Sequence, residues 1–384
     1  MKKSNLLNSL ILAALAVPSV AMAADAPTDP ASRPHMVMPA KSATPTFGDM
    51  LDASGVSING YLDVAYSYLS GTGAFTSGTA NRVFDTEPNS FNLHQAAITL
   101  AKQPKEGFGG LVNLTLGKDA GAIKSYGQTS NDFDVTQAFV QNSVGSVTVI
   151  AGKFVTASGA EVINSTANAN YSRSILFGYA IPFTHTGLRA TYAANDQLSL
   201  IAGLNNGWDQ AKDANKQKTL ELGVSYMPVK TFMLTVIDYS GREQFASNVD
   251  PVGGQRNLLD IVATLNATDQ LTFVLNYDNG TQENDSTLIK AKWSGVAGYA
   301  NYKMNDQWLV SLRAESLDDK DGYRTGVVQK WKEATLTLGY MPTQSVQLRA
   351  EVRADSSDQL SFIGSDGLAK KSQNSMGLEA IYKF

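Results

Sequence analysis

Apolar and polar residues alternate along most of the chain after residue 55, the pattern of β-strands with one apolar face. The last ten residues show it clearly, because Met376, Leu378, Ala380, Tyr382 and the terminal Phe384 take every second place. The same alternation recurs in segments 58–68, 112–116, 188–192, 220–226, 271–277 and 346–354. No change in composition marks a second folded domain, so the pattern predicts one all-β domain over residues 55–384.

The links between these predicted strands alternate between short and long. The short links carry turn-forming residues and include 103–107, 143–145, 195–196, 228–230, 267–269, 305–306 and 342–344. The long links include 70–90, 119–132, 155–183, 209–217, 241–255 and 357–372. A soluble β-sandwich also alternates along its strands, but it has no reason to keep this order of links. We therefore predict a transmembrane antiparallel β-barrel of about 16 strands, with short periplasmic turns, long extracellular loops and an aqueous channel.

A lipid environment fixes the direction of each strand face, with the apolar face outward and the polar face inward. Aromatic residues near the strand ends are expected to form belts at the two membrane interfaces. The belt expected on the outer side consists of Tyr68, Trp208, Tyr239, Tyr277, Trp293 and Trp331. The belt expected on the periplasmic side consists of Tyr226, Phe232, Tyr302, Trp308, Tyr340, Tyr382 and Phe384.

The N-terminus has the features of a secretory signal peptide. Lys2 and Lys3 precede an apolar run over 10–17 and a small-x-small site over 21–23, which predicts cleavage after Ala23. The apolar run is too short to span a membrane as a helix. Residues 24–54 are rich in Pro, Ala, Ser and Thr and are expected to form a weakly ordered periplasmic arm before the barrel at 55–384. Export followed by a barrel predicts the outer membrane as the location.

Composition narrows the possible functions. The 384 residues contain no cysteine, which excludes disulfides and a lipid-modified N-terminal cysteine, and the formal net charge of −4 gives no basic surface for nucleic acid. No cofactor, metal site or enzyme is predicted. The one alternative considered, a hydrolase using His185 with Ser172 or Ser174, depends on geometry that the sequence does not give. His94 is two residues before Ala96, so in a regular strand both side chains lie on the same face, which is expected to point outward.

Charged residues of both signs occupy strand positions whose side chains are expected to face the barrel interior. The predicted pore-lining residues are Asp63, Arg189, Glu221, Asp260, Asp278, Arg313, Glu315, Glu333, Arg349, Glu351, Arg353, Asp355, Glu379 and Lys383. Two roles stay open for them: a field across the pore that orients solutes and tunes ion preference, or pairing between neighbouring strands of the wall. Ile381 also falls on this inward face, where an apolar residue is unexpected.

The longest internal link, 155–183, combines polar residues with an apolar stretch over 175–182. A fully exposed loop would not normally display so many large apolar side chains together. We predict that this link folds into the barrel and narrows the channel, with its charged residues Glu161 and Arg173 near the constriction. The alternative is a surface loop covered by neighbouring loops.

Several of these segments resemble the OmpL-like β-barrel porin family. The resemblance rests on Gly60–Asp63, the run over 91–118, Ala151–Val155, Gly159–Ile163 and Tyr171–Arg189, and it extends over about 47–384. It implies a Gram-negative outer-membrane porin for passive diffusion of small hydrophilic solutes and ions, with Glu161 and Arg173 in the loop motif of the family.

The resemblance also bears on partners. Phe384 is similar to the C-terminal residue that outer-membrane assembly machinery recognises, and the outer-membrane lipids would surround the barrel. The chain lacks the Pro-Glu-Phe-Gly-Gly loop motif of trimeric general porins, so an oligomer is possible but its size is open. The alternative function is an outer-membrane adhesin or receptor that binds through its long loops.

Overall fold

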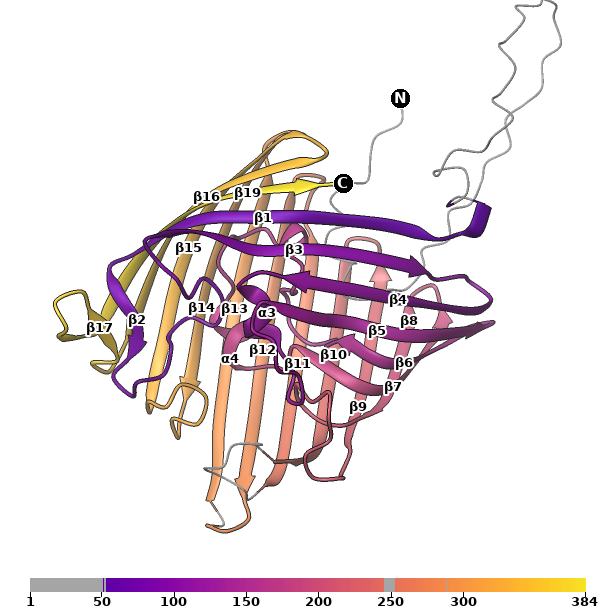
Figure 1. The fold of residues 1–384 in the computed structure, drawn as a ribbon, viewed down its shortest axis with the longest axis horizontal. Coiled ribbons are helices and arrows are strands. Elements are labelled where there is room, and N and C mark those ends of the chain that lie inside the picture. Colours follow the sequence, from indigo (N-terminus) through magenta and orange to yellow (C-terminus); the bar gives the residue numbers. More distant parts are fainter. Residues whose placement is uncertain (1–50, 52, 245–252, 288) are drawn as a thin grey trace, which may run out of the picture.

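The computed structural model describes Leu51 and residues 53–244, 253–287 and 289–384. The predicted signal peptide, 1–23, and almost all of the predicted arm, 24–54, lie outside the described residues, so both stay predictions. Within the described part, the chain forms a closed barrel of 16 antiparallel strands, which confirms the predicted fold (Figure 1). The barrel strands are β1 (Ser57–Leu69), β3 (Ser90–Lys102), β4 (Gly107–Leu116), β5 (Phe133–Val144), β6 (Val147–Val155), β7 (Thr184–Asn195), β8 (Leu198–Asn205), β9 (Thr219–Val229), β10 (Phe232–Glu243), β11 (Gly254–Asn266), β12 (Leu271–Asn284), β13 (Ile289–Lys303), β14 (Trp308–Asp319), β15 (Gln329–Thr343), β16 (Val346–Ser357) and β19 (Ser372–Lys383).

The first and last strands close the barrel. β1 pairs antiparallel with β19, and Leu62 lies opposite Tyr382. At the very end of the chain, the Gly60 amide donates to the Phe384 carbonyl (2.9 Å) and the Phe384 amide donates to the Gly60 carbonyl (3.0 Å). This pairing leaves no open sheet edge in the hydrocarbon, where unpaired backbone groups would cost several kcal/mol each.

The long links contain short elements of their own. β2 (Gly71–Phe75), β17 (Phe362–Gly364) and β18 (Ala369–Lys370) form a separate three-stranded sheet, and β2 and β17 lie side by side at one end of the barrel (Figure 1). Two short α-helices, α3 (Asp119–Ile123) and α4 (Ile175–Tyr179), and a 3-10 turn, η2 (Ser165–Ala167), lie in other links. No helix among the described residues has the length and apolar character needed to span a membrane.

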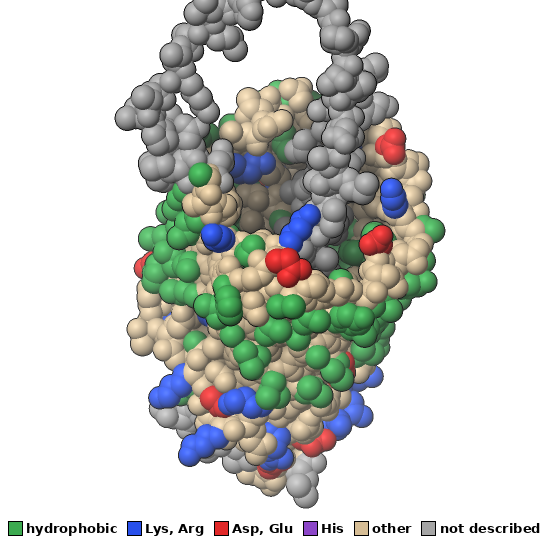
Figure 2. All heavy atoms as spheres, turned by 90° about the vertical axis from the view of Figure 1, so that its right-hand side faces the viewer, with side chains coloured by type: hydrophobic (Ala, Val, Ile, Leu, Met, Phe, Trp, Pro, Cys, Tyr) green, Lys and Arg blue, Asp and Glu red, His purple; other side chains and the backbone are tan. Residues whose placement is uncertain are grey.

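The outer wall of the barrel is apolar. Leu188, Leu275, Leu312 and Leu378 all point outward and are more than half exposed. Figure 2 shows hydrophobic side chains running across the wall as a band, with Lys, Arg, Asp and Glu side chains above and below it. The apolar faces therefore point outward, as predicted, and the band matches the hydrocarbon layer of a membrane.

The predicted outer aromatic belt is wrong for four of its six residues. Tyr68 and Tyr277 do face outward, but Trp208, Tyr239, Trp293 and Trp331 are at most 7% exposed and belong to the interior core. The reason for Trp331 is visible in the sequence, since it shares the inward parity of Glu333. A position near a strand end does not by itself place an aromatic residue in the lipid interface.

These inward aromatic residues pack beneath the outer loops. Phe75 of β2 contacts Trp331 edge-on at 5.0 Å, and Trp293 stacks on Tyr323 at 5.9 Å. Arg324 lies beside two of the indoles, with its Cζ 5.5 Å from the ring centre of Trp208 and 5.3 Å from that of Trp293. The aromatic rings thus anchor the loops to the barrel wall.

A β-bulge overturns the predicted direction of His94. Asp63 pairs with Gln95 and Val64 pairs with Leu93, so His94 is the extra residue of β3. His94 is 5% exposed and lies inside the barrel, where the prediction had placed it outside. A bulge shifts the parity of every residue beyond it, and the sequence contains no clear marker of this one.

The inward position of Ile381 has a simple explanation. Ile381 is 1% exposed and packs with Tyr61 and Ala97 in a small cluster on the inner wall. The Tyr61 hydroxyl donates to Gln95. The inner face is therefore polar overall but carries an apolar contact where three neighbouring strands can bury one.

Leu275→Arg should destabilise the barrel by about 2–4 kcal/mol, the cost of a lipid-facing arginine near the bilayer midplane. Leu275 points outward, between the outward residues Phe273 and Tyr277 of the alternating segment 271–277. The free energy of unfolding would be measured by urea titration in lipid vesicles. Leu368→Arg is the control, because Leu368 is exposed in an outer loop, and its effect should stay within about 0.5 kcal/mol. Equal losses for the two variants would contradict a lipid-facing wall at Leu275.

Candidate functional site: the barrel interior and its inner loop

Residues 156–183, here called the inner loop, connect β6 to β7 and lie inside the barrel. Ile175, Leu176, Phe177 and Ile181 are at most 2% exposed and belong to the interior core. The large apolar side chains of this link are therefore buried rather than displayed on the surface.

The two ends of the inner loop are fixed to each other and to a neighbouring loop. The Thr156 amide donates to the Phe183 carbonyl (2.9 Å). Oδ1 of Asp209, in the loop after β8, accepts from the amides of Phe183 (2.8 Å) and Thr184 (2.9 Å). Burial raises the pKa of the Asp209 carboxyl above its ordinary value.

From this base the inner loop crosses to the opposite wall, where two carboxylates bind its backbone amides. Glu315 of β14 accepts from the amides of Ile175 (2.6 Å) and Leu176 (3.0 Å). Glu351 of β16 accepts from those of Tyr171 (2.8 Å) and Ser172 (3.0 Å). Hydrogen bonds to a charged acceptor are roughly twice as strong as neutral ones, so these four contacts position the middle of the loop.

Three arginines of the same wall bind the loop carbonyls. Arg349 Nη2 donates to the carbonyls of Ser165 and Asn168, both at 2.7 Å. Arg313 Nη1 donates to the Ser172 carbonyl (2.7 Å), and Arg353 Nη1 donates to the Arg173 carbonyl (2.8 Å). Wall side chains of both signs therefore bind complementary backbone groups of one loop.

The same arginines are also paired with carboxylates of the wall. The ion pairs are Arg313 with Glu333 (2.7 Å), Arg349 with Glu379 (2.8 Å), Arg353 with Asp355 (2.7 Å) and, on another part of the barrel, Arg189 with Glu221 (2.8 Å). All these side chains are at most 10% exposed. Of the two roles left open by the sequence, pairing within the wall has direct support in these contacts.

Small residues on the wall allow the loop to come close. A Cβ atom on Gly295 of β13 would lie 2.7 Å from Leu176 Cδ1, and one on Gly377 of β19 would overlap the ring of Tyr171. Larger side chains at either position would push the loop away from the strands.

The two predicted constriction residues have different partners. Glu161 accepts from Arg313 Nη1 (2.7 Å) and from the Ser174 amide (2.7 Å). Arg173 donates to the Ile163 carbonyl (2.8 Å) and lies 5.2 Å from the ring centre of Phe84. Both side chains are buried in the barrel, but no ion pair joins them in the described structure.

The remaining predicted residues divide into three groups. Asp260 and Asp278 lie opposite each other on β11 and β12. The side-chain amide of Asn276 donates from Nδ2 to Asp260 Oδ2 (2.7 Å). Asp63 is buried on β1 near the bulge, whereas Lys383 is half-buried on the inward face near the end of β19. None of these four carboxylate or ammonium groups joins the arginine pairs described above.

Some interior contacts could not be expected from strand parity because they come from loops. Arg82, in the link after β2, donates to Asp355 Oδ2 (2.9 Å). His94 lies 3.1 Å from Asp119 Oδ1 at Nδ1 and 3.2 Å from the Tyr171 hydroxyl at Nε2. The two-residue repeat predicts side-chain direction only within strands, so it could not identify partners that come from loops.

The Ser–His alternative finds no support in the geometry. His185 Nδ1 lies 3.2 Å from the Gly207 carbonyl, and its ring stacks on Tyr239 at 4.6 Å. Ser172 and Ser174 bind groups of the inner loop and wall instead, among them Arg313 and the Phe177 amide. Within the described residues, neither serine hydroxyl is bonded to His185.

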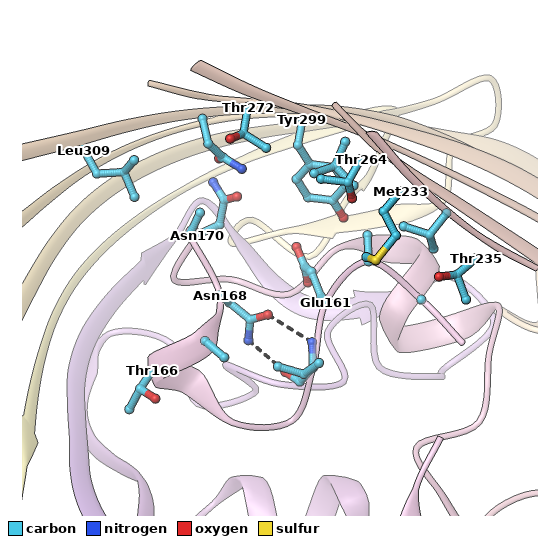
Figure 3. A pocket seen from close by; sticks show the side chains of 18 of the residues that line it. Glu161, Thr166, Asn168, Asn170, Met233, Thr235, Thr264, Thr272, Tyr299 and Leu309 are labelled. Carbon is cyan, nitrogen blue, oxygen red and sulfur yellow. Dashed lines mark hydrogen bonds between the residues drawn. The ribbon is translucent and has the colours of Figure 1, made fainter. Parts of the chain in front are cut away.

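A cavity of about 120 Å³ lies between the inner loop and strands β10 to β16 (Figure 3). Met233, Leu309 and Met341 mark its level, because each lies next to a short periplasmic turn. The cavity therefore extends to the end of the barrel that carries the short turns. Arg313 and Arg349 reach its lining, because they donate to Glu161 (2.7 Å) and to the Asn170 carbonyl (3.2 Å).

Comparison with known proteins agrees with this architecture. Residues 55–384 match the family model described as beta-barrel porin-2, OmpL-like. The structure is similar to an anion-selective porin from Comamonas acidovorans (12% identity, TM-score 0.62, 86% of this chain and 99% of that one). It is also similar to OmpT of Vibrio cholerae in its trimer form (14%, 0.60, 86% and 99%) and to the channel DcaP of Acinetobacter baumannii (12%, 0.60, 86% and 97%). No curated protein sequence matches the chain.

A closed barrel of this size with an apolar outer band and a polar interior is the architecture of an outer-membrane porin. The similarity to solved structures shows the fold, and the family model covers the whole barrel. The chain belongs to the OmpL-like beta-barrel porin-2 family, whose place is the Gram-negative outer membrane.

Glu351→Ala should free the amides of Tyr171 and Ser172 and loosen the inner loop. Leaving buried donors unpaired costs about 1–3 kcal/mol each, so hydrogen exchange at these amides should accelerate by at least tenfold. Exchange would be followed by mass spectrometry on the folded protein. Glu283→Ala is the control, since Glu283 pairs with Lys290 (3.1 Å) on the exposed outer rim. Unchanged exchange at residues 171–172 would show that Glu351 does not hold the loop.

Proposed function

We propose that this porin allows passive diffusion of small hydrophilic solutes and ions, and that the inner loop sets the width of its channel. The observation that carries the proposal is the attachment of the inner loop to the far wall through Glu315, Glu351 and Arg349. A loop bonded to both sides of a barrel must narrow the space along its axis.

Within this proposal, Glu161 and Arg173 serve the constriction in different ways. Glu161 joins the loop to Arg313 and lines the cavity, so it faces the solute path. Arg173 binds loop carbonyls and holds the loop in shape. The remaining predicted pore-lining residues would act chiefly by fixing the loop, because most of their charges are already paired.

The proposed partners follow from the same features. Outer-membrane lipids would contact the apolar band, and the assembly machinery would recognise the closing strand that ends in Phe384. An oligomer is also part of the proposal, because one protein of similar fold, OmpT, is described in a trimer form.

Purified protein in planar lipid bilayers should give stepwise conductance. The reason is that a closed barrel of this size leaves an aqueous path unless its loops seal it. Folding would be checked by heat-modifiable migration in gels. Folded protein that never conducts would overturn the proposal and favour an adhesin or receptor that acts through its outer loops.

Deleting Ile175–Ile181 should raise the single-channel conductance and the size limit for neutral solutes, because this stretch fills the lumen beside β13 and β14. Conductance and the rate of liposome swelling would both be measured. Deleting 365–368, between β17 and β18, is the matched control and should change neither value. A folded inner-loop deletion with unchanged conductance would rule out the constriction role.

A further inference from the structure

We propose that the cavity beneath the inner loop is a binding site for uncharged solutes that carry hydroxyl or carbonyl groups on an apolar body. This inference rests on the proposed function, because it assigns a substrate class to the path through the barrel. It concerns residues that the constriction argument does not use, chiefly Tyr299 and Thr264.

The walls of the cavity are mainly apolar. Met233, Val262, Val274, Leu309 and Met341 line it from the strands. Alanines 157, 160, 167 and 169 line it from the inner loop. Such a surface favours a solute with an apolar portion, since burying that portion removes it from water.

Free charge is missing from the described lining. Glu161 is the single ionisable carboxylate or cation among the residues that line the cavity, and its carboxylate already binds Arg313 and the Ser174 amide. A charged solute would lose hydration here without gaining an ionic partner. Arg313 and Arg349 border the lining, but their guanidinium groups donate to Glu161, to loop carbonyls and to wall carboxylates.

Two hydroxyl groups in the lining are available to a ligand. Thr264 Oγ1 has no hydrogen-bond partner, and the Tyr299 hydroxyl has only a long contact with Ser174 of the inner loop, although the residues are only 4% and 7% exposed. Val274 pairs with Tyr299 on one side and with Thr264 on the other, so the two residues lie on the same level of the wall. In Figure 3 both side chains point into the cavity.

A buried hydroxyl without a partner costs free energy, so it needs a water molecule or a ligand. The cavity of about 120 Å³ is comparable with cavities near 150 Å³ that hold one benzene-sized ring. Together these features fit a small neutral molecule with at least one hydroxyl or carbonyl group that can bond to Tyr299 or Thr264.

The test compares 4-hydroxybenzyl alcohol with 4-hydroxybenzoate, which have similar size but differ in charge. Equilibrium dialysis against detergent-folded protein would measure binding without requiring conduction. The neutral probe should bind at least roughly tenfold more tightly than the anion, because the lining offers the carboxylate no cation. Tyr299→Phe should weaken its binding roughly fivefold, as expected for one hydrogen bond, and Thr264→Val should weaken it several-fold.

Tyr302→Phe is the matched control, since Tyr302 lies on the outer face of the same strand and is 44% exposed. Equal binding of the two probes, or binding unchanged in Tyr299→Phe and Thr264→Val, would overturn the assignment. Conductance in bilayers separates this result from the proposed function. Binding without conductance would support the binding site and contradict the channel function. Conductance without binding would support the channel function and contradict the binding site.

Discussion

Every backbone amide and carbonyl in the hydrocarbon layer needs a partner within the protein, because lipid tails supply none. This constraint explains why the pairing of β1 with β19 extends to the carbonyl and amide of the terminal Phe384. Once the sheet is closed, each strand has one face toward lipid and one toward the lumen. The apolar band and the polar interior are two consequences of the same closure.

Closure also concentrates charges inside a confined space, where each unpaired charge would be costly. In the wall, Arg313, Arg349 and Arg353 are paired with carboxylates, and their remaining donors bind the inner loop. A buried ion pair is weak evidence for net stability, because desolvation offsets much of the attraction. The main effect of the network is to specify the position of the inner loop. Its directional bonds favour one position of a loop that could otherwise occupy several.

The sequence was sufficient to predict the barrel, its strand number and the direction of most strand faces, because alternation is set by the two-residue repeat of a strand. In the structure, Arg313, Glu351 and Glu379 are buried on the inward faces of their strands. The alternation rule failed where the repeat is interrupted, as at the bulge that turns His94 inward. Alternation holds for Trp331, which lies on the same inward face as Glu333. The aromatic-belt prediction was wrong for Trp293 and Trp331 because it used only their closeness to long loops.

The loop contacts could not be predicted for a different reason. The apolar stretch of the inner loop indicated burial, but its partners depend on strands more than a hundred residues away, such as Glu315 for Ile175. Those partners divide the lumen unequally. The β14 to β16 side is largely occupied by charged groups that bind the loop. The cavity that remains is lined from β10 to β16, and its described lining holds one carboxylate, Glu161, and no cation. Most interior charges therefore bind the inner loop or each other, and the surface left for a solute is mainly apolar.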